Sequence, residues 1–137
     1  MELSTFGAIL GFAMDYERQA EAYYQQSAIV AYPELFRSLA GESKKRYSRL
    51  ERARREGISE MILESISGLS GEKYQINIDA SVDPSVLLDQ ACLLEEHQER
   101  FYRAAAEKLP IKEVERTFLR LATENERRLS RLREFEG

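Results

Sequence analysis

Four stretches of the chain place apolar residues at the three- and four-residue spacing of one helix face. This pattern predicts four helices, at about residues 4–30, 33–56, 83–109 and 111–135. Ser4 is a suitable N-cap for the first helix, and Pro33 suits the first turn of the second. Asp83, which precedes a proline, suits the start of the third, and Gly57 suits the position just past the end of the second. The pattern therefore predicts an all-α chain.

A long connection, residues 57–82, separates the second and third predicted helices. Residues 58–66 have the spacing of a short amphipathic helix. Tyr74, Ile76 and Ile78 alternate with polar residues, as in a short extended piece. A connection of this length is uncommon in a compact domain unless it has a structural task. In an up-down bundle that task is a crossover between two helical hairpins, so we expect one domain, residues 1–137, that contains a crossover.

One helical sequence motif occurs twice in the chain. FRSLAGESKKRYSRL at residues 36–50 recurs as FLRLATENERRLSRL at residues 118–132. The two helices that precede the copies also have a shorter motif in common, a glutamate followed by an aromatic pair. It comprises Glu17 with Tyr23-Tyr24 in one helix and Glu95 with Phe101-Tyr102 in the other. A helix pair that is used twice indicates a four-helix bundle.

Polar residues interrupt the apolar stripes at equivalent places in the two halves. Seven of them share the inward spacing: Glu17, Ser43, Arg46, Glu95, Gln98, Asn125 and Arg128. Because they lie in the middle of their helices, we expect folding to bring them together in the bundle centre. A buried charge is costly unless it is paired or binds a metal. The pattern therefore indicates either a metal site or an ion-pair network.

This arrangement resembles the ferritin-like superfamily, and its rubrerythrin branch most of all. In that branch, the first and third helices each supply a glutamate followed by an aromatic pair. The second and fourth helices each supply Leu-Ala-x-x-Glu-x-x-His, and these side chains bind a di-iron or di-manganese centre. The resemblance covers all four predicted helices, and the long connection lies where the family has its crossover. It implies a ferritin-like up-down four-helix bundle.

The resemblance also shows which metal ligands are missing. Glu17 and Glu95 match the bridging glutamates of the family. The other positions have changed: Ser43 and Asn125 replace glutamates, Arg46 and Arg128 replace histidines, and Gln98 replaces a further glutamate that rubrerythrins often carry. Arginine keeps its proton in proteins and offers a metal no lone pair. The only histidine, His97, is turned about 200° around the helix from Glu95. We therefore expect no metal and no cofactor, but a buried network that pairs Glu17 and Glu95 with Arg46 and Arg128.

Three functions remain open from the sequence. The first is a rubrerythrin-like protein that has lost di-metal binding and catalysis and acts by binding or assembly. Ferritin-like proteins commonly dimerise through bundle faces, so this hypothesis includes a homodimer or a higher homo-oligomer. The alternative is a di-iron or di-manganese oxidoreductase, a peroxidase or ferroxidase that uses Glu17 and Glu95 with non-standard further ligands. The third is a pocket for an anion or another small ligand that uses Arg46 and Arg128.

Simpler interpretations exist for individual residues. Glu42 and Glu124 stand four residues before Arg46 and Arg128, which is also the spacing of surface salt bridges within one helix. Alternatively, the two glutamates are metal ligands shifted by one position. Three further residues are expected to be structural: Tyr24 and Tyr102 as core aromatics with a bonded hydroxyl, and Cys92 as a small buried residue.

Composition narrows the class of partner. The net charge is −4 at pH 7, which does not favour nucleic acid. The basic run at residues 44–55 has the character of a solvated helix face that complements acidic neighbours. A single cysteine excludes an internal disulfide and suits a reducing compartment. The apolar run at residues 6–14 is too short to cross a bilayer. We expect a cytoplasmic protein without a nucleic-acid or membrane partner.

Overall fold

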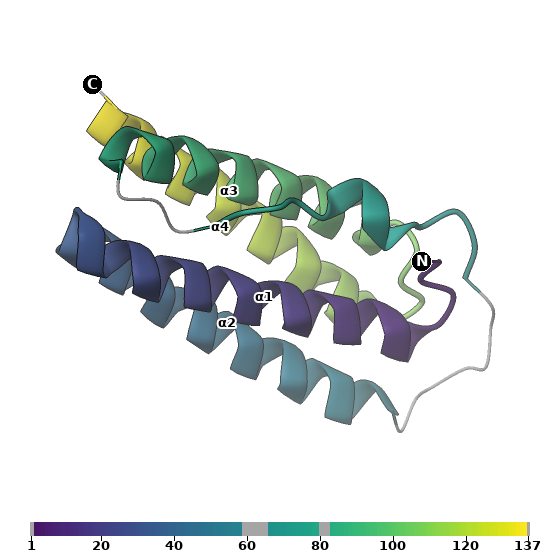
Figure 1. The fold of residues 1–137 in the computed structure, drawn as a ribbon. Coiled ribbons are helices and arrows are strands. Elements are labelled where there is room, and N and C mark those ends of the chain that lie inside the picture. Colours follow the sequence, from purple (N-terminus) through teal and green to yellow (C-terminus); the bar gives the residue numbers. More distant parts are fainter. Residues whose placement is uncertain (1, 59–65, 80–82, 137) are drawn as a thin grey trace.

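The computed structural model describes residues 2–58, 66–79 and 83–136. These residues form four α-helices and one short 3-10 helix, and they contain no strand beyond an isolated bridge between Glu2 and Ser70. The helices are α1 (Phe6–Val30), α2 (Pro33–Ile58), η1 (Gly71–Tyr74), α3 (Pro84–Ala106) and α4 (Lys112–Glu136), as Figure 1 shows. The prediction of an all-α bundle is confirmed.

The N-cap of the first helix lies one residue later than predicted. Thr5, rather than Ser4, is the N-cap of α1, because its side-chain oxygen accepts a hydrogen bond of 3.0 Å from the backbone N–H of Ala8. The carbonyl oxygen of Ser4 instead accepts a hydrogen bond of 2.9 Å from the backbone N–H of Ile66. Ser4 therefore ties the start of the chain to the connection between α2 and α3.

Two predicted helix ends also differ from the structure. Gly57 lies inside α2, which continues to Ile58, so it is not the residue that ends the helix. A Cβ atom at Gly57 would lie 2.5 Å from the ring of Phe6, so close packing explains the glycine. The third helix ends at Ala106, earlier than predicted, because the next N–H groups bond to carbonyls only three residues back. The predicted start of α3 is confirmed, since Asp83 accepts a hydrogen bond from the backbone N–H of Ser85.

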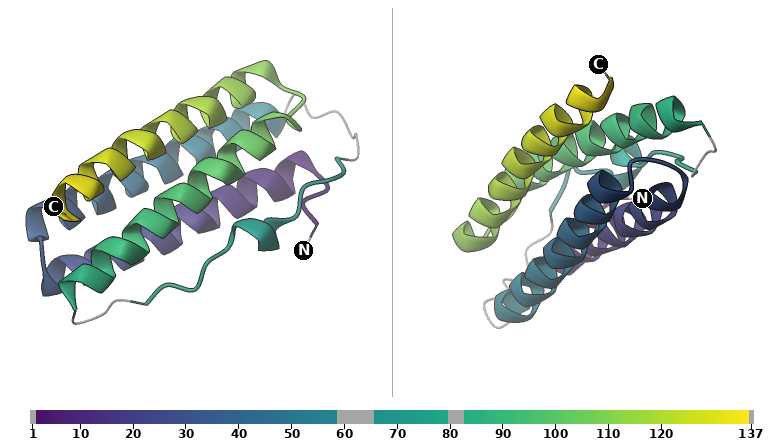
Figure 2. Two further views of the ribbon diagram at one scale, coloured as in Figure 1. Left: turned by 90° about the horizontal axis from the view of Figure 1, so that it is seen from above. Right: turned by 90° about the vertical axis from the view of Figure 1, so that its left-hand side faces the viewer.

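The helices form two antiparallel hairpins, α1 with α2 and α3 with α4, that pack against each other (Figures 1 and 2). Tyr24, late in α1, contacts Glu95 in α3, whereas Glu17, earlier in α1, contacts Tyr102 farther along α3. This order makes α1 and α3 antiparallel. Consequently α2 and α3, which follow each other in the sequence, run in the same direction.

Residues 66–79 lie beside α1 and run in the same direction. The N–H of Leu3 donates to the carbonyl of Leu69, and the hydroxyl of Tyr16 donates to the carbonyl of Tyr74. Farther along, the N–H of Asp79 donates to the side chain of Gln90 at 3.0 Å, near the start of α3. This segment covers the face of the bundle that α1 and α3 share (Figure 1).

The predicted alternation of inward and outward residues in this connection is seen in which side chains are buried. Tyr74, Ile76 and Ile78 are half-buried against the core, and the residues between them are exposed. Tyr74 itself, however, ends a 3-10 helix rather than beginning an extended piece. Most of the amphipathic helix predicted for residues 58–66 lies outside the described residues, as do residues 80–82 of the connection.

The apolar stripes of the four α-helices meet in one core. On the side of α1 and α3, aromatic rings close the core around Phe101. Its ring lies 4.8 Å from Phe12, 5.8 Å from Tyr74 and 5.3 Å from Tyr102, between ring centroids. Within the described part of the chain, none of the helices has both the length and the apolar character that a bilayer crossing needs.

Candidate functional site: a buried glutamate-arginine network

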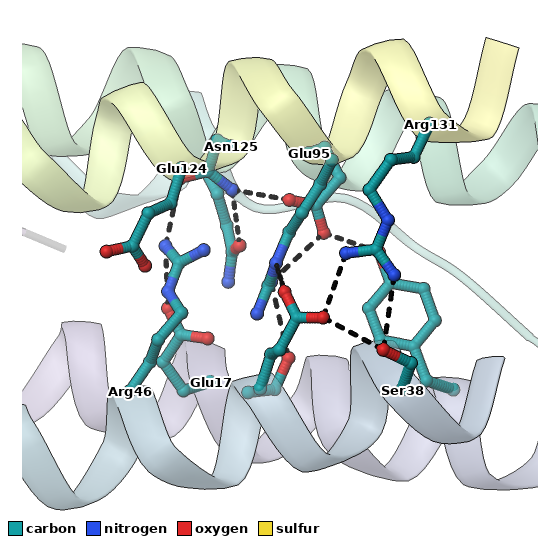
Figure 3. A network of polar contacts seen from close by, with 12 residues as sticks. Glu17, Ser38, Arg46, Glu95, Glu124, Asn125 and Arg131 are labelled. Atoms are coloured by element: carbon teal, nitrogen blue, oxygen red, sulfur yellow. Dashed lines mark hydrogen bonds and ion pairs between the residues drawn. The ribbon is translucent and has the colours of Figure 1, made fainter. Parts of the chain in front are cut away.

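The seven polar residues predicted to face inward are linked by contacts in the middle of the bundle, and all four α-helices contribute to them. Figure 3 labels four of the seven: Glu17, Arg46, Glu95 and Asn125. Their exposed fractions are 0% for Glu17, Ser43, Glu95 and Gln98, 1% for Arg46 and Asn125, and 2% for Arg128. Four of these residues are charged, so the centre of the protein contains two carboxylates and two guanidinium groups with almost no access to water.

The first half of the network surrounds Glu17. One oxygen of its carboxylate lies 3.2 Å from Nη2 of Arg46. Tyr102 donates a hydrogen bond from its hydroxyl group to the same oxygen. The guanidinium of Arg46 also lies 5.3 Å from the centroid of the Tyr102 ring, within the range of a cation–π contact. Arg46 and Tyr102 thus both stabilise the negative charge of Glu17.

The second half surrounds Glu95 and repeats this arrangement. Oε2 of Glu95 lies 3.5 Å from Nη1 of Arg128, and it accepts a hydrogen bond of 2.5 Å from the hydroxyl group of Tyr24. Each carboxylate is therefore held by an arginine from α2 or α4 and by a tyrosine from the opposite hairpin. The two copies of the sequence repeat thus form two similar halves of the site, related by an approximate twofold symmetry.

Asn125 breaks this symmetry and joins the halves. Its side-chain oxygen accepts a hydrogen bond of 2.9 Å from Arg46, and its NH₂ group donates to Glu95 at 2.6 Å and to Gln98 at 3.0 Å. The equivalent residue of the other half, Ser43, has a shorter side chain, and it accepts a long hydrogen bond of 3.4 Å from Arg128. The amide of Asn125 can both donate and accept, so it links a guanidinium to a carboxylate.

A second layer of ion pairs lies between α2 and α4, farther from the centre. Glu42 lies 3.3 Å from Arg128 and 2.8 Å from Arg131, and Glu124 lies 2.9 Å from Arg49. The two glutamates thus pair with arginines of the opposite helix. The alternative of surface salt bridges within one helix, Glu42 with its own Arg46 and Glu124 with its own Arg128, is wrong for the described residues.

Arg49 and Arg131 were not among the residues selected from the sequence. The signal that could have found them is the repeat itself, because they stand at equivalent places, one helical turn after Arg46 and Arg128. Ser38, which accepts a hydrogen bond of 3.1 Å from Arg131, was likewise missed (Figure 3).

Burial and charge set the protonation of this centre. Burial, together with the neighbouring charge of Glu95, raises the pKa of Tyr24 well above its ordinary value of 10. Burial and the charge of Glu17 raise the pKa of Tyr102 in the same way. Burial alone would lower the pKa of Arg128, but the carboxylates of Glu95 and Glu17 outweigh it and the pKa is raised. Both tyrosines therefore remain hydrogen-bond donors, and Arg128 remains a cation.

Several buried polar atoms in this centre have no hydrogen-bond partner among the described residues. Three are guanidinium nitrogens, Nε and Nη1 of Arg46 and Nη2 of Arg128, and the others nearby are Oε1 of Glu17 and Nε2 of Gln98. A buried polar atom without a hydrogen-bond partner costs free energy. The described residues therefore leave donors and an acceptor in this site that a ligand could bond to.

These residues do not fit the di-metal centre that the resemblance implies. Three of the four carboxylate oxygens of Glu17 and Glu95 are already engaged. Oε2 of Glu17 contacts Arg46 and Tyr102. Oε1 of Glu95 accepts a hydrogen bond from Asn125, and its Oε2 accepts one from Tyr24. A guanidinium carries a positive charge and has no lone pair for a metal. Across residues 2–58, 66–79 and 83–136, no group of three or more His, Cys, Asp or Glu side chains could hold a metal ion.

The remaining candidates lie outside the network. The ring of His97 bonds to the carbonyl of Leu93 in its own helix, at 2.9 Å. Cys92 is half-buried rather than fully buried as predicted, and its thiol donates to Glu136 at 3.3 Å. Burial and this contact raise the pKa of Cys92 to about 12, so its thiol is not poised for nucleophilic or redox chemistry.

Compared with protein-family models, with curated proteins and with solved structures, the chain gives no significant match.

Proposed function

We propose that this protein is a metal-free, ferritin-like four-helix bundle of rubrerythrin type that acts by binding or assembly rather than by catalysis. The observation that carries the proposal is the position of Arg46 and Arg128. They stand where the resembling family has its metal-binding histidines, and each lies against a glutamate that matches a metal ligand, at 3.2 Å and 3.5 Å.

The electrostatics of the centre support this proposal. A di-metal centre places cations among carboxylates, and here two guanidinium groups stand among Glu17 and Glu95. The four formal charges sum to zero without a metal. A divalent ion added to this set would face two fixed positive charges and only two carboxylates, which is unfavourable in a medium of low dielectric constant.

The topology supports the ferritin-like part of the proposal. Because α2 and α3 run in the same direction, the chain must return along the length of the bundle between them. Residues 66–79 lie beside α1 and run in its direction, as expected for part of such a crossover. The sites of the ferritin-like fold lie between facing helices in the bundle centre, where this network lies.

The decisive experiment is metal analysis of the full chain. The protein would be purified without an affinity tag from cells supplemented with iron and manganese, and its metal content per chain would be measured by elemental analysis. We expect a content close to zero for both metals. One or two metal ions per chain would contradict the proposal and support the di-iron or di-manganese oxidoreductase, with Glu17, Glu95, Glu42 and Glu124 as the first ligands to mutate.

Assembly is the second part of the proposal. We propose a homodimer or a higher homo-oligomer, because ferritin-like proteins commonly dimerise through their bundle faces. Sedimentation equilibrium over a range of concentrations tests this directly. A single species at the mass of one chain, 15.8 kDa, at all concentrations would contradict it.

A further inference from the structure

A strongly basic groove lies over the buried network, between α2 and α4. It has a volume of about 330 Å³ and is lined by six basic side chains and two glutamates. Figure 3 shows Arg46 and Arg131 reaching into the space between these two helices. Because the basic residues outnumber the acidic ones, an anion has a favourable electrostatic potential in this groove.

Most of the charges in the groove are paired within the protein. Glu124 pairs with Arg49, and Glu42 pairs with Arg131 and Arg128. Arg46 pairs with Glu17. Two of the six basic residues remain, Lys45 on α2 and Arg127 on α4. Both are exposed, and neither forms an ion pair or hydrogen bond within the part of the chain that the structure describes. They stand at equivalent places in the repeat, so they form a symmetric pair of free cations at the rim of the groove.

Two buried arginines of the network carry hydrogen-bond donors that the described residues leave unused. Arg46 and Arg128 are 1% and 2% exposed, and both line the groove. Nε and Nη1 of Arg46 and Nη2 of Arg128 are buried nitrogens that have no hydrogen-bond partner among the described residues. These nitrogens can only donate, so an acceptor is needed to satisfy them. Guanidinium groups match the geometry of phosphate and carboxylate oxygens, which makes an oxyanion the natural acceptor.

The opposite side of the bundle is closed. Residues 66–79 cover it, held by hydrogen bonds from Tyr16 and Gln19 to their carbonyl groups, and the ring of Phe101 packs among other aromatic rings beneath them. A ligand therefore approaches the buried arginines through the groove between α2 and α4.

We infer that the groove between α2 and α4 binds a small phosphate-bearing molecule, with Lys45 and Arg127 at the rim and Arg46 and Arg128 at the floor. A volume of about 330 Å³ lies at the lower end of the range for small-molecule pockets, which suits a compact ligand such as a diphosphate group. The inference rests on the proposed function, because a metal-free centre leaves both buried arginines in place as donors.

Calorimetric titration of the full chain tests the inference. Pyrophosphate and inorganic phosphate are the probes, at low ionic strength and in buffer freed of metals on a chelating resin, so that no metal-phosphate complex contributes. We expect saturable binding of pyrophosphate with one site per chain, and weaker binding as salt is added. The double variant Lys45→Gln/Arg127→Gln should bind about tenfold more weakly or worse, because each charge-assisted contact is lost without disturbing the core.

The matched control is Lys44→Gln/Arg120→Gln. It removes the same charge from the same two helices at exposed positions that do not line this groove. Its affinity for pyrophosphate should stay within about twofold of the wild type. Circular dichroism of each variant shows whether the helices are intact. If the control weakens binding as much as the groove variant does, the attraction is not specific and the inference is wrong.

The other possible results of these titrations distinguish a failure of this inference from a failure of the proposed function. A wild-type protein that binds neither probe overturns the inference, and so does one that binds a single-stranded oligonucleotide but not pyrophosphate, since its partner is then a polymer. Metal content is measured on the same samples. Metal-free protein without pyrophosphate binding contradicts only this inference, whereas stoichiometric iron or manganese contradicts the proposed function.

Discussion

Arg46 of α2 and Glu17 of α1 lie 3.2 Å apart, and their side chains are 2% and 0% exposed. An ion pair in such a place loses the hydration of both charges, and the attraction between them compensates only when further hydrogen bonds assist. Tyr102 and Asn125 supply two of these bonds. The two residues therefore depend strongly on each other. If one is removed, the free-energy cost of burying the charge of the other is no longer compensated.

Arg46→Met should destabilise the protein severely. The substitution leaves Glu17 as an unpaired buried charge, so we expect the free energy of unfolding in urea to fall by about 3–5 kcal/mol. The control is Arg49→Met, which removes a partner of Glu124 at the surface, where both side chains are about one-third exposed. That change should cost only about 0.2–1 kcal/mol.

The double variant Arg46→Met/Glu17→Gln should recover much of the loss. It removes both charges together, and glutamine can still accept the hydrogen bond from Tyr102. A double-mutant cycle built from urea unfolding curves measures the coupling between Arg46 and Glu17. If the two single losses simply add, the residues are independent and the network does not exist as described.

Alkaline pH should unfold the protein through Tyr24 and Tyr102. The pKa of each is raised in the folded protein by burial and by the adjacent glutamate, whereas unfolded tyrosine titrates near pH 10. Above about pH 10 the folded state thus binds more protons than the unfolded state, and stability falls as the pH rises. Below that pH both states keep these protons, so the two tyrosines cause no pH dependence there.

Tyrosinate absorbance and circular dichroism, followed together in an alkaline titration, check this prediction. Part of the tyrosinate signal should appear only as helix is lost. That part should shrink in the Tyr24→Phe/Tyr102→Phe variant but not vanish, because burial also raises the pKa of Tyr16 and Tyr23. Complete ionisation of all seven tyrosines while the helices remain intact would show that the two are not protected.

Restoring the expected ligands should create a metal site. The variant Ser43→Glu/Arg46→His/Asn125→Glu/Arg128→His has the four glutamates and two histidines of the resembling family, with Glu17 and Glu95 unchanged. We expect it to bind iron, measured by elemental analysis after dialysis, and the wild type not to.

The matched control for this restoration is Ser43→Glu/Asn125→Glu, which adds the two carboxylates but retains both arginines. It should not bind iron, because the guanidinium groups still occupy the centre and hold the carboxylates. A folded fourfold variant that binds no iron would mean that the helices do not align these positions as in the family.

Gly71→Ala should destabilise the contact between the long connection and α1. A Cβ atom there would lie 2.6 Å from the ring of Phe12, which is buried and cannot easily move. We expect a loss of about 1–3 kcal/mol in thermal or urea unfolding. Gly41→Ala is the control: this glycine is an exposed residue of α2 with open space around it, so alanine should stabilise the protein by about 0.5–1 kcal/mol. A neutral Gly71→Ala would show that the connection does not pack tightly on Phe12.

The spacing of apolar residues was sufficient to predict the four helices and their buried faces. Helical periodicity depends only on the local sequence, and it placed even the charged residues Glu17 and Arg128 inside. Helix ends were less well predicted. Glycine is typical of the position just past a helix end, but Gly57 lies within α2, where the ring of Phe6 packs against it. That contact joins residues far apart in the sequence, and no local rule contains it.

The sequence by itself determined that two carboxylates and two guanidinium groups would share the bundle centre, because residue type and helical phase are local properties. Only the tertiary structure decided the partners. Glu42 stands one turn before Arg46 in its own helix, yet it pairs with Arg128 and Arg131 across the groove. The packing of α2 against α4 sets these distances, and it leaves the side chains of Lys45 and Arg127 at the groove rim without partners in the part of the chain that the structure describes.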